Sequence, residues 1–191
     1  MPPLQTLLDQ CATLHEHLCP RQVLGVRMGM HAADVLGLDL PQRDKRLLSI
    51  VETDGCFVDG VTVATGCTLG HRTLRCVDEG KVAATFVDTQ GGQAVRIHPS
   101  PLARGLASRY APDAPSRWHA YLDGYQAMPV EELLVTDAVT LAMPVELLVS
   151  SPDRRATCET CGEEVFNGRE VVMDGRVLCL RCADPVRSYL R

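Results

Sequence analysis

Hydrophobic residues recur at helical spacing in the first forty residues of the chain. Leucines at positions 4, 7 and 8 predict a helix over residues 3–14, and a longer apolar stripe predicts a second helix over residues 20–38. The break between them ends at Pro20, which disfavours the α conformation at the preceding residue but suits a first helical turn. The second helix also carries a strip of small residues where another backbone can pack closely, at Gly25, Gly29 and Ala33.

From residue 47 onward the apolar residues come in short runs rich in β-branched side chains. These runs predict strands at residues 47–52, 61–65, 82–87, 94–97 and 138–143. The Gly-Gly pair at 91–92 predicts a hairpin between the third and fourth of them. Helical patterns return at residues 100–110, 116–128 and 130–135. This order indicates an α+β fold, with N-terminal helices packed on an antiparallel sheet.

Four cysteines near the end of the chain have the spacing of a zinc site. They form a C-x2-C-x17-C-x2-C pattern, at Cys158, Cys161, Cys179 and Cys182. Two such pairs can close a tetrahedron of thiolates around one Zn²⁺, with no position left open for a substrate. Asn-Gly at 167–168 and Asp-Gly at 174–175 predict tight turns between short strands, and Pro185 suits the start of a helix. We therefore expect a structural zinc ion in a small zinc-ribbon or treble-clef-like domain.

The zinc motif divides the chain into two predicted domains. Residues 1–149 form the α+β core domain, residues 150–156 a polar linker, and residues 157–191 the four-cysteine zinc-binding domain. A segment of about 40 residues rarely buries enough core to fold without a metal or another staple. The second domain is therefore expected to depend on its zinc.

Composition and charge narrow the classes of function. The chain has 191 residues and nine cysteines, but its start does not read as a leader and no apolar run reaches the ~18 residues of a membrane span. We expect a cytoplasmic protein that uses cysteine for metal or redox chemistry rather than for disulfides. The net charge of −5 and the 4% of aromatic residues disfavour a nucleic-acid partner.

A second group of metal-binding residue types lies in the core domain, at His17, Cys19, Cys56 and Cys67. Cys19 precedes a predicted helix, whereas Cys56 and Cys67 each follow a predicted strand, and such ends can converge on one cleft. A histidine and two or three thiolates there would hold a second, soft or borderline metal ion with one position open. Alternatively, Cys19 or Cys56 acts as a catalytic thiolate with His17 as ligand or general base, or the cysteines only fill space in the core.

The remaining histidines and cysteines give weaker indications of a functional site. His71, after a glycine, is a candidate donor in the same cleft, and His15 is a weaker alternative to His17. Cys11 and Cys76 are expected to be core or incidental residues. The chain shows no nucleotide loop, no pterin site and no iron–sulfur spacing beyond the zinc pairs, so no cofactor-binding motif is assigned.

Four blocks in the first hundred residues form a larger ordered pattern. They are H-L-C-P at 17–20 with G-V-R-M-G at 25–29, E-T-D-G-C-F-V-D-G-V at 52–61, T-G-C-T-L-G at 65–70, and G-K-V-A at 80–83. Together they resemble the FmdE family, named for the FmdE component of the molybdenum or tungsten formylmethanofuran dehydrogenase, in which a C-terminal zinc module is also common. Glu16, Arg21 and His71 depart from the family pattern, which usually has Gly, Gly and Lys there.

The resemblance implies a metal-binding accessory protein of anaerobic, methanogenesis-type one-carbon metabolism, working beside molybdenum or tungsten dehydrogenase subunits. It implies a functional cluster at His17, Cys19 and Cys56, with Cys67 as a further member. The sequence does not establish catalysis by the chain itself, and the alternative is a small metal- or thiolate-dependent enzyme that uses the same cluster. The strip of small residues suggests a homodimer.

Overall fold

The computed structural model describes residues 1–149 and 153–187, which divide into two compact units, 1–145 and 146–191. The sequence places the boundary at the linker 150–156, of which residues 150–152 lie outside the described residues. None of the helices described is long and apolar enough to cross a membrane.

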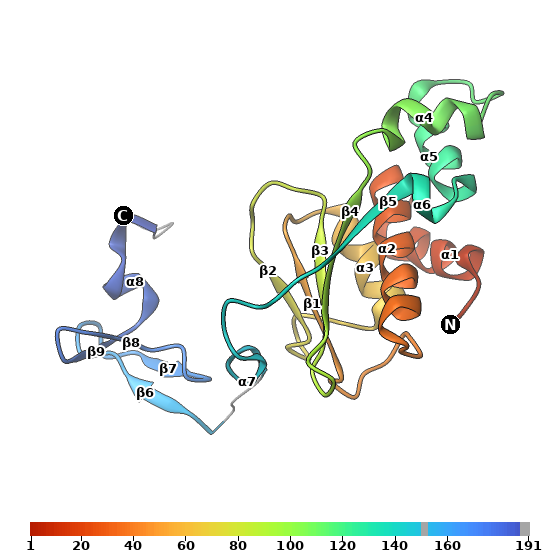
Figure 1. Ribbon diagram of the computed structural model, residues 1–191. Helices are drawn as coiled ribbons and strands as arrows, with labels where there is room; N and C mark the ends of the chain where they lie inside the picture. Colours follow the sequence, from red (N-terminus) through yellow and green to blue (C-terminus); the bar gives the residue numbers. More distant parts are fainter. Residues whose placement is uncertain (150–152, 188–191) are drawn as a thin grey trace. The chain divides into compact units, whose positions relative to one another are not determined.

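Three helices form one layer of the first unit: α1 (Leu4–His15), α2 (Pro20–Leu36) and α3 (Cys56–Thr65). The two N-terminal helices are those predicted from the apolar spacing. In α1, Leu7, Leu8 and Cys11 are fully buried, so Cys11 is a core residue as expected, whereas Leu14 is 64% exposed. The apolar stripe of α2 is buried against the sheet and α3, and that of α1 is buried against α2 and α3, which holds this layer together (Figure 1).

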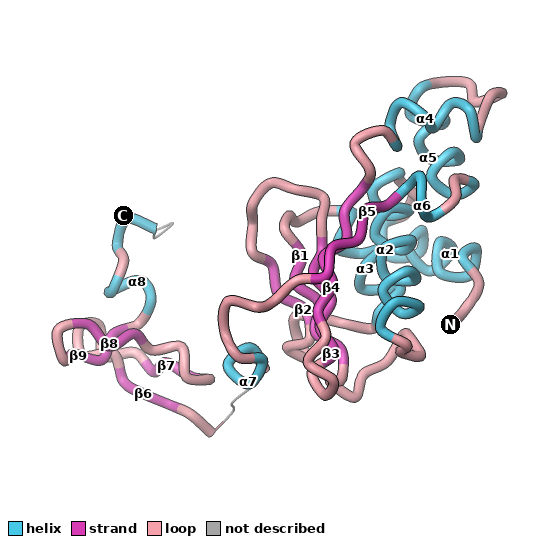
Figure 2. The backbone as a smooth tube through the Cα atoms, in the orientation of Figure 1, coloured by secondary structure: helices cyan, strands magenta, loops and turns pink. Residues whose placement is uncertain are grey.

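The second layer is a five-stranded sheet in the order β2-β1-β3-β4-β5 (Figure 2). Its strands are β1 (Leu47–Val51), β2 (Leu74–Cys76), β3 (Ala84–Asp88), β4 (Ala94–Pro99) and β5 (Leu134–Ala138). The expected hairpin joins β3 to β4 with Phe86 opposite Val95. The predicted α+β class is confirmed, but the sheet is mixed, because β2 runs parallel to β1.

Two predicted strands are wrong. Residues 61–65 belong to α3, and the last strand of the sheet lies at 134–138 rather than at 138–143. The alternating Val and Thr residues of 61–65 imitate a strand. However, the buried residues of this segment recur at helical spacing over a longer window, at Phe57, Gly60, Val61 and Ala64.

Helices α2 and α3 cross with their backbones in contact, at Gly25 and Gly60. A Cβ atom at Gly25 would collide with the carbonyl oxygen of Phe57, and one at Gly60 would collide with that of Gln22. The strip of small residues is therefore a packing surface within the chain, as its spacing suggests. Because α3 covers this strip, a homodimer would have to use another surface.

The remaining helices of the first unit are α4 (Ala103–Tyr110), α5 (Arg117–Ala127) and α6 (Val130–Leu133), and α7 (Val145–Leu148) follows β5. The end of α5 is fastened to α2 by Arg27, whose guanidinium donates to the carbonyl oxygens of Tyr125, Gln126 and Met128 at 3.0, 2.7 and 2.8 Å. These bonds satisfy carbonyl groups that a helix end leaves without partners. They also fix the position of α5 over the start of α2.

The second unit contains two small hairpins. Strands β6 (Arg155–Thr157) and β7 (Glu164–Phe166) flank the first cysteine pair, and β8 (Val171–Met173) and β9 (Arg176–Leu178) are joined by Asp174-Gly175. Both residues of this turn have positive φ, as the Asp-Gly sequence predicts. The second cysteine pair lies at α8 (Leu180–Ala183), and a 3₁₀ turn at Pro185–Arg187 takes the place of the expected helix within the described residues.

Candidate functional site

The four cysteines of the second unit come together as a metal site. Their sulfur atoms all lie within 4.8 Å of one another, and those of Cys161 and Cys179 are 3.9 Å apart. A tetrahedron with Zn–S bonds of about 2.3 Å has edges of about 3.8 Å. The donor set and its dimensions therefore fit one zinc ion.

Backbone amide groups of the two cysteine loops prepare this site for a cation. Amide hydrogen bonds from Cys161 and Cys179 lower the pKa of the Cys158 thiol to about 6, so this sulfur is a thiolate at neutral pH. The hydrogen bond to the Cys179 thiol, together with burial, raises the pKa of Cys182 to about 12. Cys158 therefore offers one thiolate to a metal ion, and metal binding would displace the protons of the thiols whose pKa is raised.

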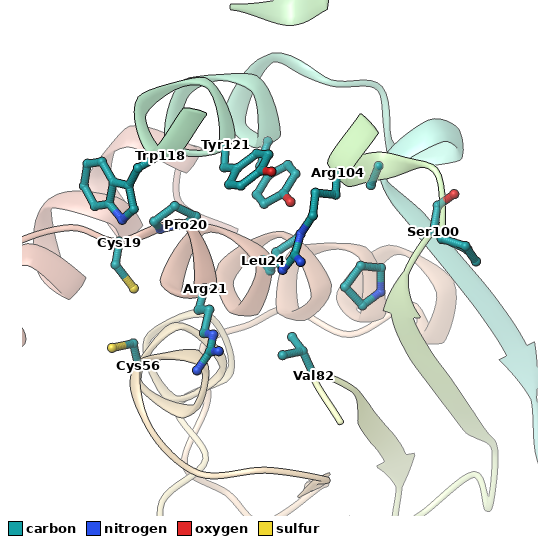
Figure 3. A pocket seen from close by; sticks show the side chains of 14 residues that line it. Cys19, Pro20, Arg21, Leu24, Cys56, Val82, Ser100, Arg104, Trp118 and Tyr121 are labelled. Carbon is teal, nitrogen blue, oxygen red and sulfur yellow. The ribbon is translucent and has the colours of Figure 1, made fainter. Parts of the chain in front are cut away.

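In the first unit, Cys19 and Cys56 meet at the starts of two helices. Cys19 is the N-cap residue of α2, and Cys56 is the first residue of α3, directly after Gly55 with a φ of +80°. The two thiols lie close enough for Cys19 to influence the pKa of Cys56, and both residues line the same cavity (Figure 3). The convergence of these two residues follows from the Gly25–Gly60 crossing of their helices.

The buried side chain of Gln22 holds the backbone of Cys19. Its Oε1 accepts from the amide of Cys19 at 2.8 Å, and its Nε2 donates to the carbonyl oxygen of Cys11 at 3.4 Å. Gln22 is fully buried, so these bonds are protected from water. The first turn of α2 is thereby tied to α1, and the position of Cys19 is fixed.

Burial and neighbouring charges oppose ionisation of the thiols in this region. Burial, the neighbouring Cys19 thiol and the charge of Asp59 raise the pKa of the Cys56 thiol. Burial and the charge of Asp59 also raise the pKa of Cys11, to about 12. Asp59 lies one helical turn after Cys56, so its carboxylate adds negative charge near the thiol pair.

A cavity of about 620 Å³ opens beside the two thiols. It lies where the first turns of α2, α3, α4 and α5 approach the ends of β3 and β4. Its size is within the range of about 300–1,000 Å³ found for small-molecule sites. The starts of several helices therefore border this cavity.

Comparison with known proteins identifies the family. The family described as FmdE, molybdenum formylmethanofuran dehydrogenase operon, matches residues 14–135. The chain belongs to the FmdE family. The prokaryotic dksA/traR C4-type zinc finger matches residues 153–186, in agreement with a structural zinc site at the four cysteines.

Two individual proteins extend this assignment. A probable S-adenosyl-L-methionine-binding protein of Archaeoglobus fulgidus is 31% identical over 94% of this chain and 53% of its own length. The chain thus spans about half the length of that relative. The crystal structure of a tungsten formylmethanofuran dehydrogenase FmdE-like protein from Syntrophus aciditrophicus has the same fold, with a TM-score of 0.58, 21% identity and coverage of 97% and 94% of the two chains.

The structure of this FmdE-family chain separates the residues predicted to share a second metal site. Cys67 follows the opposite end of α3 from Cys56, about 15 Å away along a ten-residue helix. Its thiol is buried and donates to the carbonyl oxygen of Leu47 at 3.5 Å. Cys67 therefore lies in the core and not at the cavity, because the segment before it is a helix rather than the expected strand.

The two histidines predicted as ligands, His17 and His71, are both exposed. His17 lies in the short connection between α1 and α2 with its ring exposed, and His71 is exposed and contacts Thr68 Oγ1 at 2.8 Å through Nδ1. Over residues 1–149 and 153–187, the zinc cysteines are the one group of three or more potential ligands within 4.8 Å of one another. In this conformation the first unit brings together two sulfur ligands.

The far side of the cavity is built from residues that the sequence did not single out. Tyr121 and Tyr125 stack with ring centres 5.8 Å apart, and the guanidinium of Arg104 lies over Tyr121 at 5.6 Å. Trp118 is 44% exposed at the cavity (Figure 3). These residues have no motif spacing with the cysteines, and the aromatic ones follow Cys56 by more than sixty positions. The sequence signals in this stretch were the predicted helices over residues 100–110 and 116–128, which correspond to α4 and α5.

Proposed function

We propose that this protein is a metal-binding accessory protein of one-carbon metabolism, which holds a second metal ion at Cys19 and Cys56 of its FmdE domain. The observation that carries the proposal is the proximity of two thiols at two helix starts, which line one cavity of cofactor size. Two sulfur ligands suit a borderline or soft ion such as Zn²⁺ or Cu⁺. The cavity leaves room for an exogenous ligand to complete the coordination.

His17 is the proposed third protein ligand. It lies two residues before Cys19 in the connection between helices, and its ring is exposed. A rotation of this short segment would direct the ring toward the thiols. Metal binding would also displace the thiol protons, which the burial of Cys56 otherwise retains, and the starts of α2 and α3 favour the resulting negative charge.

The second part of the proposal is that the protein works in the cytoplasm beside a molybdenum or tungsten dehydrogenase. It is supported by the family, which is described through the formylmethanofuran dehydrogenase operon. The zinc unit, with short strands and many exposed charged residues, would contact the partner or stabilise the chain.

The name of the Archaeoglobus relative raises S-adenosylmethionine as a ligand of the cavity. This chain matches only about half of that protein. The sulfonium and ammonium groups would also lie among residues that include Arg21 and Arg104 and no acidic side chain in the described lining. We therefore expect weak binding of S-adenosylmethionine, measurable by equilibrium dialysis with the labelled compound.

A competing function uses the same thiols without a metal. The contact between Cys19 and Cys56 also suits a redox or nucleophilic pair in a small enzyme. The two functions differ in metal content. A thiol enzyme would contain the structural zinc alone and would lose activity on alkylation of these cysteines.

Elemental analysis of the full chain separates these functions. The wild-type protein should contain two metal ions per chain, and the Cys19→Ser/Cys56→Ser variant should contain one. Cys76→Ser is the matched control, because Cys76 is exposed at the edge strand β2 and does not line the cavity. One metal ion in all three proteins, after purification with added Zn²⁺, would refute the second metal site.

A further inference from the structure

The cavity beside Cys19 and Cys56 has an unusual charge for this protein. The chain carries a net charge of −5, yet the described residues that line the cavity include Arg21 and Arg104 and no aspartate or glutamate. Arg21 extends beside Cys56, and Arg104 extends from α4 toward Leu24 (Figure 3). The charged side chains of the described lining are therefore both cationic, whereas the carboxylate of Asp59, which is not part of this lining, influences the Cys56 thiol.

These two arginines differ from the other arginines that hold the first unit together. Arg27 binds three backbone carbonyl groups, Arg46 pairs with Asp88, and Arg96 pairs with Glu52. By contrast, among the residues described, neither Arg21 nor Arg104 forms an ion pair with a carboxylate. Arg104 contacts only the aromatic wall, over the ring of Tyr121 and through a hydrogen bond with Tyr125. Their charges remain available to a ligand.

The backbone adds to this positive field. The cavity lining includes residues of the first turns of α2, α3 and α4, namely Pro20, Cys56 and Ala103. Each helix start carries a partial positive charge, and the three converge on one space. Ser100, just before α4, adds a hydroxyl group to the same wall. A ligand with two negative charges would be stabilised here better than a neutral one.

The aromatic side chains indicate the rest of the ligand. Trp118 and Tyr121 line the cavity, and Trp118 keeps 44% of its surface exposed. Exposed aromatic faces favour stacking with a flat ring, and the stacked pair of Tyr121 and Tyr125 gives this wall a fixed orientation. A wall of this kind beside two guanidinium groups matches a molecule with a planar ring at one end and a phosphate at the other.

From this arrangement we propose that the cavity binds a phosphate-bearing ligand of the nucleotide class. The phosphate lies between Arg21 and Arg104 at the helix starts, and the base lies against Trp118 and Tyr121. The inference uses the cavity of the proposed function, but it does not need a metal ion at Cys19 and Cys56. When both are present, the ligand lies next to the thiol pair and limits access to the metal.

Trp118 makes the inference directly testable, because it is the only tryptophan in the chain and lines the cavity. The probes are 5′-AMP, adenosine and inorganic phosphate, titrated into the full-length protein while tryptophan emission is recorded. AMP should give a saturable change at least tenfold tighter than adenosine or phosphate alone. Isothermal titration calorimetry on Trp118→Phe should still show heat of AMP binding, so that a change in emission is not mistaken for binding elsewhere.

Arginine variants test the position of the phosphate. Arg21→Gln and Arg104→Gln should each weaken AMP binding about tenfold, about 1.4 kcal/mol, and leave adenosine binding unchanged. Arg109→Gln is the matched control, because Arg109 is an exposed arginine of the same helix α4 outside the cavity lining. The inference would be overturned by the absence of saturable AMP binding up to about 5 mM, which is within the weak-binding range. Equal AMP binding by both cavity variants and the wild type would overturn it as well.

The dithiol variant distinguishes this inference from the proposed metal site. AMP titration and elemental analysis are therefore made on the same wild-type preparation, and the metal content of Cys19→Ser/Cys56→Ser is compared with it. AMP binding in a protein with one metal ion per chain would refute the second metal site alone. Two metal ions without AMP binding would refute the nucleotide inference alone.

Discussion

Replacing Gly60 by alanine should disturb the crossing that brings Cys19 and Cys56 together. The new Cβ would collide with the carbonyl oxygen of Gln22, lie 2.9 Å from the backbone nitrogen of Val26 and lie 3.0 Å from the Cα atom of Gly25. All three atoms belong to the backbone of α2, so no side chain can turn away to make room. The helices must separate, since carbon atoms pack without strain at about 3.5–4.0 Å.

Two opposing contributions set the size of the effect. Overpacking of this kind costs about 1–3 kcal/mol, whereas replacing glycine by alanine within a helix gains up to about 1 kcal/mol. The free energy of unfolding of Gly60→Ala should therefore fall by about 1–2 kcal/mol. Because Cys56 lies four residues before Gly60, separation of the helices should also move the thiols apart and lower occupancy of the proposed second metal site.

Urea unfolding followed by Trp118 emission measures the stability of the first unit, which holds the only tryptophan. The matched control is Gly105→Ala in α4, where a Cβ would meet no atom within 4 Å. This variant should gain about 0.5–1 kcal/mol from helix propensity alone. If Gly60→Ala were as stable as Gly105→Ala, the close backbone contact would not exist and the explanation for the meeting of Cys19 and Cys56 would be wrong.

Three further outcomes are expected. Chelation of zinc, or Cys179→Ser, should unfold residues 153–187, because the buried core there consists only of Cys158, Val165 and Leu178 among the described residues. The amide chemical shifts of this unit should collapse to unfolded values, while Trp118 emission from the first unit stays unchanged. Glu52→Gln should cost about 1–2 kcal/mol near pH 7, since Glu52 binds Arg96 through both oxygens at 2.6 and 2.7 Å. The hydrogen bond from Arg96 lowers the folded-state pKa of Glu52, so the contribution of Glu52 to stability is present above the usual value of about 4.3 and is lost as pH falls through the folded-state pKa. In urea titrations the control Glu79→Gln, which alters an exposed pair, should differ little from the wild type in stability at either pH 7 or pH 3. Gln22→Leu should destabilise by about 1–3 kcal/mol and reduce metal content, because the amide of Cys19 would lose its acceptor; unchanged metal content would contradict a positioning role for Gln22.

The parts of the fold that the sequence predicts are those governed by local rules. The apolar stripe and Pro20 define α2, and Gly91-Gly92 marks the β3–β4 hairpin. The Asp-Gly turn of the zinc unit has the positive φ angles that its sequence requires. In each case the deciding information lies within a few residues of the element.

Helix α3 shows where local patterns mislead. Its alternating Val and Thr residues favour a strand, but Gly60 must lie against Gly25 of α2, a residue thirty-five positions away. That contact, together with burial of Phe57 and Val61, outweighs the weak propensity of β-branched residues for strands. The error carried over to Cys67, which a strand end would have placed near the cleft and the helix instead places in the core.

The cavity was beyond sequence reasoning for a related physical reason. Its thiols lie on two helix starts, and its aromatic wall lies on a helix more than sixty residues later. Only the tertiary packing, fixed in part by the hydrogen bonds of Arg27 to the end of α5, brings these surfaces together. Arg21 was visible as a departure from the family pattern, and its place on the cavity wall gives that departure a chemical meaning.

The overall acidity of the chain does not oppose an anionic ligand in this cavity. At physiological ionic strength the charges on a protein surface are screened over about 8 Å, so distant carboxylates have little influence inside the site. The described lining contributes two arginines and the starts of several helices, which act at short range on a bound ligand. Adding salt should therefore weaken the binding of AMP, because it screens the guanidinium groups, while adenosine binding should change little. An acidic protein repelling its ligand would show the reverse, with AMP binding strengthened by salt.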